Sequence, residues 1–299
     1  MVDAAPNMTA SPVVMPALPP LPKRLEIELS SACNLRCTYC PRRFLNDISA
    51  FMDVDLFCRI IDEVTPHPET ILVLHRRGES LLHPRLDECL DYLKGKFQTI
   101  QLATNATLLD DAINNRLIEA LSFISFSLDA PEAFDRTRKP ARYVDVAARV
   151  ERFLRQNAGR VQTQVSMVKT DKTPESDVAR FKAIWQGKVD RVRIYAEHSA
   201  GGRFGALEQG RAGRVACAMP FYEMLVFSDG RVGRCNHDWN GAPLGDLNDA
   251  TIAQIWNSDA YRALRTEHHG LALTDPVCRD CDSWYPIPGH QMTGEIHGE

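Results

Sequence analysis

Three cysteines near the start of the chain have the spacing of a metal-cluster site. Cys33, Cys37 and Cys40 form a C-x3-C-x2-C pattern directly after a predicted strand at Leu25–Ser30. Three thiolates can hold three irons of a cubane [4Fe–4S] cluster and leave the fourth iron without a protein ligand, where a small chelating molecule could bind. The alternatives are a zinc site that lacks its fourth ligand and reduced thiols in a loop.

A second group of cysteines lies in the last third of the chain. Its spacing is C-x17-C-x42-C-x2-C, and its first two members bracket a predicted β-hairpin at 221–227 and 231–235. The four thiols are expected to converge on one fully ligated site, which zinc could also fill. Cys58 and Cys89 fall inside predicted helices, so we expect packing residues rather than hydrogen donors. The second group consists of Cys217, Cys235, Cys278 and Cys281.

The first cysteine group resembles that of the radical S-adenosylmethionine (SAM) enzymes. The spacing, the preceding strand and Tyr39, just before the third cysteine, carry this resemblance. It implies that the amine and carboxylate of SAM chelate the open iron and that an electron from the cluster cleaves the sulfonium. The resulting 5′-deoxyadenosyl radical would take a hydrogen atom from the substrate. In such enzymes Tyr39 would lie against the adenine, and a flavodoxin- or ferredoxin-type protein would donate the electron.

Another segment resembles the G-G-E-P motif of this family, which holds the methionyl amine of SAM. This segment, His75–Pro84, follows the second predicted strand. Gly78 and Glu79 match the motif, whereas Arg77 and Ser80 replace its first Gly and its Pro. The resemblance therefore implies a SAM contact with altered geometry near Arg77.

Two further resemblances concern the fourth strand and the C-terminal cysteines. Ser125–Glu132 is similar to the strand-four segment that contacts the ribose and carboxylate of SAM, which makes Asn105, Ser127 and Asp129 cofactor-binding candidates. Capping or turn formation is the alternative role for each. The C-terminal cysteines resemble the twitch subdomain, the shortened SPASM domain, which holds one auxiliary cluster. The implied cofactors are two [4Fe–4S] clusters and SAM, a cluster being favoured over zinc at the second site.

Short apolar runs alternate with helical segments from Leu25 to about Ala196, which predicts βα units and a parallel sheet. Six units fall short of the eight that close a TIM barrel, and the family's usual core is such a partial barrel. We therefore expect an α/β fold with a partial (β/α)6 TIM barrel, followed by a small auxiliary-cluster subdomain made of a β-hairpin and helices. The expected strands are 25–30, 70–75, 99–104, 122–128, 161–168 and 191–196, and the expected helices are 53–64, 84–95, 110–121, 143–157 and 174–186.

Composition suggests the domain boundaries. Residues 1–22 contain six prolines and no basic stretch followed by an unbroken apolar run, so we expect a disordered arm rather than a signal peptide. Several glycines predict a linker at 201–214. This linker would separate the barrel, 23–200, from the auxiliary-cluster subdomain, 215–285, and a tail would follow at 286–299.

The predicted strands carry polar side chains on one face. Residues i, i+2 and i+4 of a strand share a face, and one face is polar in nearly every strand. Because apolar faces must turn to the covering helices, the polar faces would line the barrel and favour a polar substrate. A solvent-exposed sheet face is the alternative. The polar groups that are candidates for catalysis are Glu28, His75, Arg193, Glu197, His237 and Asp238.

Charge and composition exclude several classes of partner. The net charge is −4 with scattered basic residues, so we expect no nucleic-acid partner. No stretch approaches the roughly 18 apolar residues of a transmembrane helix, so we expect no membrane partner. The chain has nine cysteines, an odd number with uneven spacing, and some of them form two short clusters, which favours metal ligation in a reducing cytoplasm over disulfides.

The expected reaction follows from elimination among the family's activities. Relatives with a twitch subdomain include dehydrogenases and epimerases of aminocyclitols and aminoglycoside sugars. An epimerase usually needs a Cys donor near the cluster, and none is spare there. Peptide maturases commonly carry a leader-binding domain, which an arm of 22 residues cannot build. We therefore expect oxidation of a secondary alcohol of a small sugar-like or aminocyclitol-like substrate to a ketone, with the auxiliary cluster accepting an electron. The alternatives are epimerisation, dehydration, peptide modification and a non-catalytic iron–sulfur electron carrier.

Overall fold

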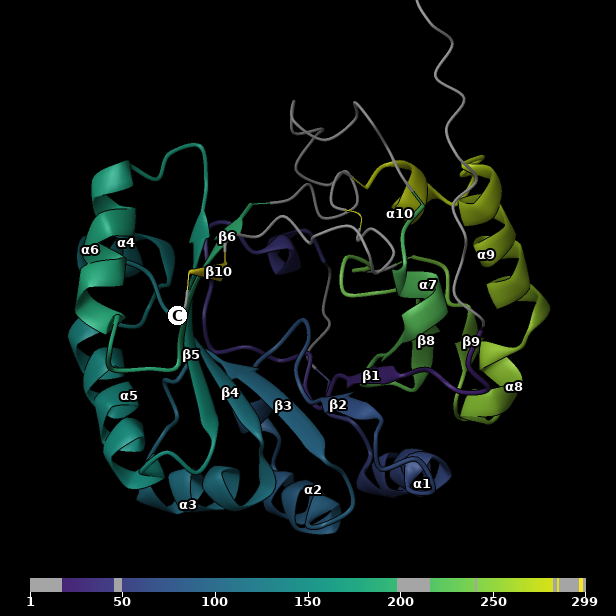
Figure 1. Cartoon of the computed structure of the whole chain (residues 1–299), viewed down its shortest axis with the longest axis horizontal. Helices are drawn as coiled ribbons and strands as arrows, with labels where there is room; N and C mark the ends of the chain where they lie inside the picture. The colour runs from purple at the N-terminus through teal and green to yellow at the C-terminus, as the bar shows by residue number, and fades with distance from the viewer. Residues whose placement is uncertain are drawn as a thin grey trace, which may run out of the picture.

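A curved parallel sheet with helices on its outer face forms the larger part of the protein (Figure 1). The computed structural model describes residues 18–45, 50–197, 216–239, 241–281, 284 and 296–297. Six strands pair in parallel in chain order, which confirms the expected partial barrel. They are β1 (Arg24–Ile27), β2 (Ile71–Val73), β3 (Thr99–Thr104), β4 (Phe123–Ser127), β5 (Gln162–Lys169) and β6 (Arg191–Ala196).

Alternation along the strands separates an apolar face from a polar one. In β3, Ile100 and Leu102 are buried in the hydrophobic core, whereas Gln101 faces the opposite side and accepts a hydrogen bond from Arg24 of β1 (3.2 Å). In β4 and β5 the buried polar face contains Ser125 and Gln164, whose side chains hydrogen-bond at 3.0 Å. The polar side chains of neighbouring strands thus contact one another on the concave face of the sheet.

The helices that cover the barrel begin where the sequence predicts. Asp53 caps α1 by accepting from two backbone N–H groups of the first turn (2.9 and 3.0 Å), and Asp110 caps α3 by accepting from one (2.9 Å). One short helix, α4, was not predicted, because seven residues hold too few apolar positions to show a period. The helices are α1 (Val54–Val64), α2 (Leu86–Leu93), α3 (Asp111–Ala120), α4 (Pro131–Thr137), α5 (Tyr143–Asn157) and α6 (Glu175–Trp185), with 3-10 turns η1 (Pro41–Phe44) and η2 (Ser80–Leu82).

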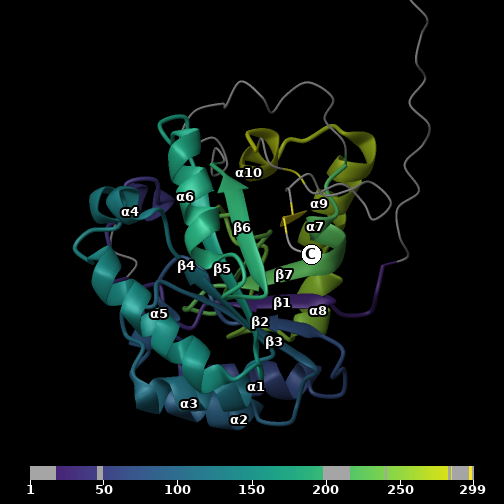
Figure 2. The same cartoon turned by 60° about the vertical axis from the view of Figure 1, so that its left-hand side comes forward.

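The C-terminal part continues the barrel sheet. Strand β7 (Glu223–Val226) pairs in parallel with β1, with Arg24 opposite Glu223, and is followed by the antiparallel strands β8 (Arg231–Gly233) and β9 (Gly245–Asp246). The predicted hairpin exists, but it is joined to the barrel through the edge of β1 (Figure 2). Four helices complete this part: α7 (Met219–Tyr222), α8 (Ile252–Trp256), α9 (Asp259–Gly270) and α10 (Pro276–Arg279).

The segments expected to lack structure lie partly outside the described residues. This applies to residues 1–17 of the arm and to the whole linker 201–214. The described end of the arm contacts α8, since Trp256 Nε1 donates to the carbonyl of Pro19 (2.9 Å). In the tail, β10 (Ile296–His297) pairs antiparallel with β6. Among the described helices, none has the length and apolar character needed to cross a membrane.

Candidate active site

The first cysteine loop is fixed by backbone hydrogen bonds to the end of α4 and the residues that follow it. Arg36 N–H donates to the carbonyl of Lys139 (2.8 Å), and Thr38 N–H donates to that of Thr137 (2.9 Å). Burial raises the pKa of the thiols, that of Cys37 to about 12, although the nearby Arg138 guanidinium acts in the opposite direction. Thiolate ligation therefore requires a strong positive charge at this loop, which cluster irons would provide. Cys33, Cys37 and Cys40 can hold such a cluster.

Gly78 brings the segment after β2 into direct contact with the cysteine loop. A Cβ at Gly78 would lie 2.3 Å from the carbonyl oxygens of Ser30 and Ala32, so the close approach requires glycine. The next residue, Glu79, donates its backbone N–H to the carbonyl of Ala32 (2.7 Å). These contacts place the segment predicted to hold the SAM amine directly beside Cys33.

Glu79 and Asn105 connect three loops at the carboxyl ends of the strands. The buried Glu79 carboxylate accepts from Thr104 Oγ1 (2.8 Å) and from the backbone N–H of Asn105 (2.7 Å). Asn105 Nδ2 in turn donates to Asn34 Oδ1 (2.9 Å), next to Cys33. Both predicted cofactor-binding residues therefore lie at the cysteine loop, and the Glu79 side chain orients its neighbours.

Asp129 leaves one carboxylate oxygen available beside the cysteine loop. Its Oδ2 accepts from Tyr39 Oη (3.1 Å), Thr137 Oγ1 (2.9 Å) and Arg138 Nε (2.9 Å). Its Oδ1 is buried and has no hydrogen-bond partner among the described residues. An orphaned buried acceptor is costly unless a ligand donates to it, so this oxygen could accept from a hydroxyl or amine of a bound ligand. Ser127 lies half-buried at the end of β4.

Arg138 was missed by the sequence reasoning. Its guanidinium is buried, pairs with Asp129 and lies 5.4 Å from the centre of the Tyr39 ring. An isolated Arg after a short helix has no spacing pattern that would have drawn attention to it. Its position makes it a fixed positive charge next to Cys37.

A buried ionic network fills the polar interior near β1. Arg24 Nε donates to Glu223 Oε2 (2.7 Å), and Glu26 lies 3.5 Å from Arg76 and 3.7 Å from Arg24. Burial, reinforced by the Glu223 charge, raises the pKa of Glu26 to about 7. Glu26 and Glu223 were not predicted as site residues. Glu26 shares the polar face of β1 with the predicted residue Glu28, and this spacing was the available signal.

His75 and Glu28 occupy structural positions in this interior. Ala103 N–H donates to His75 Nδ1 (2.9 Å), and burial lowers the pKa of His75 to about 3, so the ring is neutral. Glu28 is fully buried and holds Arg77 through two bonds of 2.7 and 2.8 Å, while Ser228 Oγ donates to it at 3.0 Å. These contacts favour structural roles over the catalytic roles expected for both residues.

Two consecutive arginines connect the segment after β2 to the C-terminal part. Arg77 also donates to the carbonyl of Trp239 (3.0 Å) and lies over the ring of Phe227 (4.0 Å). Arg76 donates to the carbonyl of Asp238 (2.7 Å) and lies over the indole of Trp239 (4.8 Å). The replacement of the family's glycine by Arg77 thus creates contacts with the segment that follows Cys235.

The four C-terminal cysteines line one small cavity together with His237. The His237 ring nitrogen Nδ1 lies 3.7 Å from Cys281 Sγ, and its backbone N–H donates to Cys235 Sγ (3.4 Å). Burial raises the pKa of the Cys235 and Cys278 thiols. Among the described residues, which include both cysteine groups, no three His, Cys, Asp or Glu side chains are arranged to hold a metal ion. A donor set of four thiols around one cavity fits a cluster.

The remaining predicted residues are dispersed. Asp238 is fully buried and accepts from Arg234 (2.9 Å), so it fixes the loop after Cys235. Arg193 lies 4.5 Å from the ring of Tyr195 on β6. Glu197 directly follows β6, and burial raises its pKa. Cys58 and Cys89 lie on α1 and α2.

Comparison with known families identifies the two parts. Residues 27–182, just over half of the chain, match the family model of the Radical SAM superfamily. The chain belongs to the Radical SAM superfamily. Residues 217–282 match the SPASM model, an iron–sulfur cluster-binding domain. The cofactors of this radical SAM protein are SAM and two [4Fe–4S] clusters, in agreement with the sequence-based prediction.

The curated relatives match only part of this chain. The chain is 34% identical over 109 residues to the tungsten-containing aldehyde ferredoxin oxidoreductase cofactor-modifying protein of Pyrococcus furiosus, which is 36% of this chain and 31% of the relative. It is 28% identical over 134 residues to the GTP 3′,8-cyclase of Chlorobaculum tepidum, 44% of this chain and 40% of the relative. The chain thus spans less than half the length of these curated relatives.

Solved structures share the fold. BtrN in complex with AdoMet and 2-DOIA is 18% identical, with 88% of this chain and 93% of BtrN covered and a TM-score of 0.61. SuiB of Streptococcus suis, bound to the precursor peptide SuiA, is 15% identical, with 83% and 68% covered and a TM-score of 0.65. At these identities the likeness establishes the fold.

Proposed function

We propose that this radical SAM enzyme oxidises a secondary alcohol of a small polar substrate, such as an aminocyclitol or amino sugar, to a ketone. In this proposal Cys33, Cys37 and Cys40 hold the SAM-binding cluster, and the four C-terminal cysteines hold an auxiliary cluster. When bound, SAM and its cluster supply a 5′-deoxyadenosyl radical that removes a hydrogen atom from carbon. The residues of the chain must then bind the substrate, take the hydroxyl proton and provide a route for one electron.

The observation that carries the proposal is the cavity shared by the four C-terminal cysteines. A cluster with four thiolate ligands has no open iron for substrate, so its available role is electron transfer. Cys58 and Cys89 lie on α1 and α2, in the layer outside the sheet, so neither thiol is placed to return a hydrogen atom to a substrate radical. Two-electron oxidation is the reaction that fits both facts.

The proton of the alcohol needs an acceptor at the carboxyl ends of the strands. His75, with a pKa near 3, is too weak a base at neutral pH. Glu197 directly follows β6, is half-buried, and has a pKa raised by burial and by Asp171. A carboxylate with a raised pKa is better matched to proton transfer near neutrality, so Glu197 is our candidate base.

Known structures support a small substrate. BtrN, which was solved with AdoMet and 2-DOIA, is covered over 93% of its length by this chain, whereas SuiB is covered over 68%. The buried polar groups Ser125, Gln164 and Ser166 on β4 and β5 would offer hydrogen bonds to hydroxyl groups.

The test is an anaerobic metabolite screen of the reconstituted enzyme for substrate-dependent 5′-deoxyadenosine. Oxidation predicts a product lighter by two hydrogen atoms, with carbinol deuterium recovered in 5′-deoxyadenosine. A product of unchanged mass that carries solvent deuterium on carbon would indicate epimerisation. A product lighter by one water molecule would indicate dehydration. Either outcome would refute the dehydrogenase proposal.

A peptide substrate is the second candidate, because SuiB was solved with its precursor peptide. Peptides should therefore be screened beside aminocyclitols and amino sugars under the same conditions. Formation of 5′-deoxyadenosine with peptides alone would favour this candidate.

A further inference from the structure

A buried arginine on α9 has no acidic partner. Among the described residues, Arg77, Arg138 and Arg234 are also buried, and each forms an ion pair with a carboxylate. Arg265 is only 5% exposed, yet it pairs with no carboxylate in the part of the chain that the structure describes. Burying a charge without a counter-charge is costly. The position of Arg265 therefore calls for a source of negative charge nearby.

Neutral groups surround the Arg265 guanidinium. Its Nε donates to the carbonyl of Pro220 (2.8 Å), and its Nη1 donates to that of Trp256 (2.7 Å). The guanidinium lies over the rings of Trp256 and Tyr261, 4.2 and 4.8 Å from their centres. Its Nη2 is buried and has no hydrogen-bond partner among the described residues. Burial lowers the pKa of Arg265 to about 10, so the group still carries its positive charge at neutral pH.

Arg265 supports one wall of the cavity that the C-terminal cysteines share. Helix α9 packs beside α7 and α8 (Figure 1), and Pro220 of α7, which accepts from Arg265, lines this cavity. His268, one turn further along α9, also lines it and accepts from the backbone N–H of Cys217 through Nδ1 (3.4 Å). Arg234 lines the cavity as well, but two aspartates already pair with its charge. Arg265 thus brings to this wall a positive charge that no described carboxylate neutralises.

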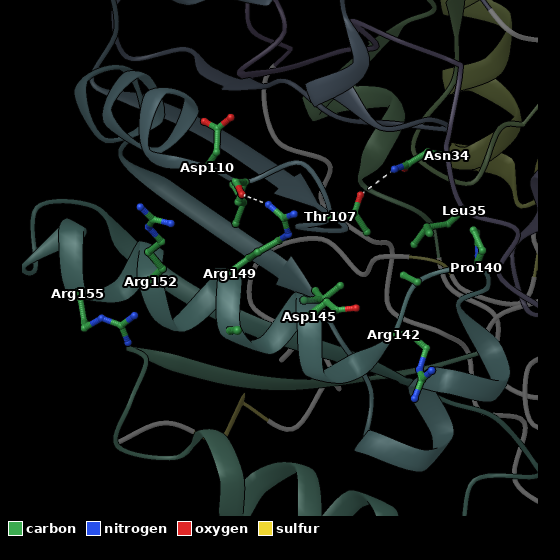
Figure 3. Close-up of a pocket in the computed structure, with 14 residues that line it drawn as sticks. Asn34, Leu35, Thr107, Asp110, Pro140, Arg142, Asp145, Arg149, Arg152 and Arg155 are labelled. Carbon is green, nitrogen blue, oxygen red and sulfur yellow. Dashed lines mark hydrogen bonds between the residues drawn. The ribbon is translucent and has the colours of Figure 1, made fainter.

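Burial distinguishes Arg265 from the arginines in the groove between the first cysteine loop and α5 (Figure 3). There Arg142 pairs with Asp135 and Arg152 pairs with Asp111, and the two arginine side chains are 70% and 55% accessible. Solvent and these carboxylates screen both charges. The apolar surroundings of Arg265 screen its charge much less, so its field extends to the cysteine cavity.

We propose that Arg265 is the counter-charge of the auxiliary cluster and raises the reduction potential of that cluster. The proposal rests on the proposed cluster at the four C-terminal cysteines, but not on the identity of the substrate. A cubane held by four thiolates has a net negative charge, and net charge is one of the factors that set its potential. An electron accepted there adds negative charge, which a fixed guanidinium stabilises.

The couple that Arg265 influences transfers one electron and no atom. In the proposed oxidation, this electron leaves the substrate radical as its hydroxyl proton passes to a base and the C=O bond forms. Arg265 touches neither the substrate nor the reacting atoms, so it acts as a positioning residue whose effect is measurable as a potential.

The test is a redox titration of the full-length holoenzyme at pH 7 without substrate, followed by EPR spectroscopy. The auxiliary couple is the one that persists when Cys33, Cys37 and Cys40 are replaced by Ala. Arg265→Gln and Arg265→Met remove the charge, so we expect its one-electron reduction to become about tenfold less favourable, a potential lower by about 59 mV. Arg265→Lys should keep a potential close to that of the wild type, because the charge remains.

Arg262→Gln is the matched control on the same helix. Arg262 is 61% accessible and pairs with the exposed Asp259, so its removal changes the net charge equally but should leave the potential unchanged. An unchanged potential in the uncharged Arg265 variants overturns the proposal, and so does an equal fall in Arg265→Lys or in this control. If the uncharged variants lose the auxiliary iron, its retention in Arg265→Lys supports the counter-charge, and its loss there overturns the proposal.

The titration also separates this proposal from the dehydrogenase proposal. Epimerisation or dehydration in the metabolite screen would refute alcohol oxidation without altering the potentials measured in the absence of substrate. A wild type with zinc in the C-terminal site would show no second iron couple, which would refute the auxiliary cluster and the role of Arg265 together.

Discussion

At the scale of single residues, Gly78 determines how closely the segment after β2 approaches the first cysteine loop. The atoms that a Cβ would meet are backbone atoms of Ser30, Ser31 and Ala32, between β1 and Cys33, which a side chain cannot displace without moving the start of the cysteine loop. The motif alone predicts a glycine at this position. The contacts with Ser30 and Ala32 give the physical reason for it.

We expect Gly78→Ala to weaken SAM binding by at least about tenfold, because the segment must move away from the cysteine loop. Anaerobic equilibrium binding of SAM to the reconstituted protein measures this. Gly270→Ala is the matched control, since a Cβ at Gly270 meets no atom within 4 Å. Equal SAM affinities for both variants would contradict the assigned role of Gly78.

His75 gives a prediction about pH. Its pKa is lowered from 6.5 to about 3 by burial, with Arg24 and Arg76 adding to the effect. Between these values the unfolded chain binds a proton that the folded chain does not bind, so the free energy of unfolding falls as the pH drops below 6.5.

His75→Asn should remove this dependence while keeping an acceptor for Ala103 N–H. Between about pH 7.5 and about pH 5.5 the variant should lose about 1 kcal/mol less unfolding free energy than the wild type. Anaerobic urea unfolding at the two pH values measures the difference. Identical losses would mean that His75 titrates normally in the folded protein.

At the scale of the elements, hydrophobic periodicity predicted the six barrel strands and their covering helices, because each buries a continuous apolar face. It did not predict that β7 would pair with β1, since pairing between distant segments depends on register and side-chain partners. Here Arg24 lies opposite Glu223 and bonds to it, an ion pair between residues that the sequence places far apart. Alternation alone carries no such information.

The buried ion pair of Arg77 and Glu28 joins the segments that follow β1 and β2. We expect Arg77→Lys to lower the free energy of unfolding by roughly 3 kcal/mol. A lysine cannot form both bonds to Glu28, donate to Trp239 and lie over the Phe227 ring at once. Calorimetric unfolding of the holoenzyme measures the loss, and the spectrum of the auxiliary cluster should also change, because the loop after Cys235 loses an anchor.

An exposed pair with the same geometry provides the control. Arg85 bonds to Glu88 through two contacts of 2.7 Å, but both side chains are about half accessible. Arg85→Lys should therefore leave stability and cluster spectra nearly unchanged, because solvent screens the pair. If the two substitutions had similar effects, burial of Arg77 would not be the cause.

At the scale of the whole molecule, the cysteine spacing predicted that four thiols would gather around one cavity. They come from the segment before α7, the loop after β8, helix α10 and the residues that follow α10. Cysteines in such a pattern have few roles other than metal ligation, so the sequence predicts their function. The sequence predicts the roles of carboxylates and arginines less well, because the same residue type can act in catalysis or form a structural ion pair. Glu28 and Asp238, expected to be catalytic, are held by Arg77 and Arg234.

The final prediction concerns how the two cysteine groups divide the iron. With two cubanes, the wild type should contain about eight irons. Replacing Cys33, Cys37 and Cys40 by Ala should halve the iron and abolish SAM cleavage, because no open iron remains near Gly78. Replacing Cys235 and Cys278 should also halve the iron content while SAM cleavage is retained.

The controls for this division are Cys58→Ser and Cys89→Ser, which should keep all the iron. Cys89 is fully buried, so its replacement introduces a buried hydroxyl and a modest loss of stability. Anaerobic analysis of iron, sulfide and zinc measures the metal content of the wild type and of every variant. Half the expected iron together with one zinc in the wild type would mean that the C-terminal thiols bind zinc. The electron acceptor on which alcohol oxidation depends would then be missing, even though the SAM-binding cluster was intact.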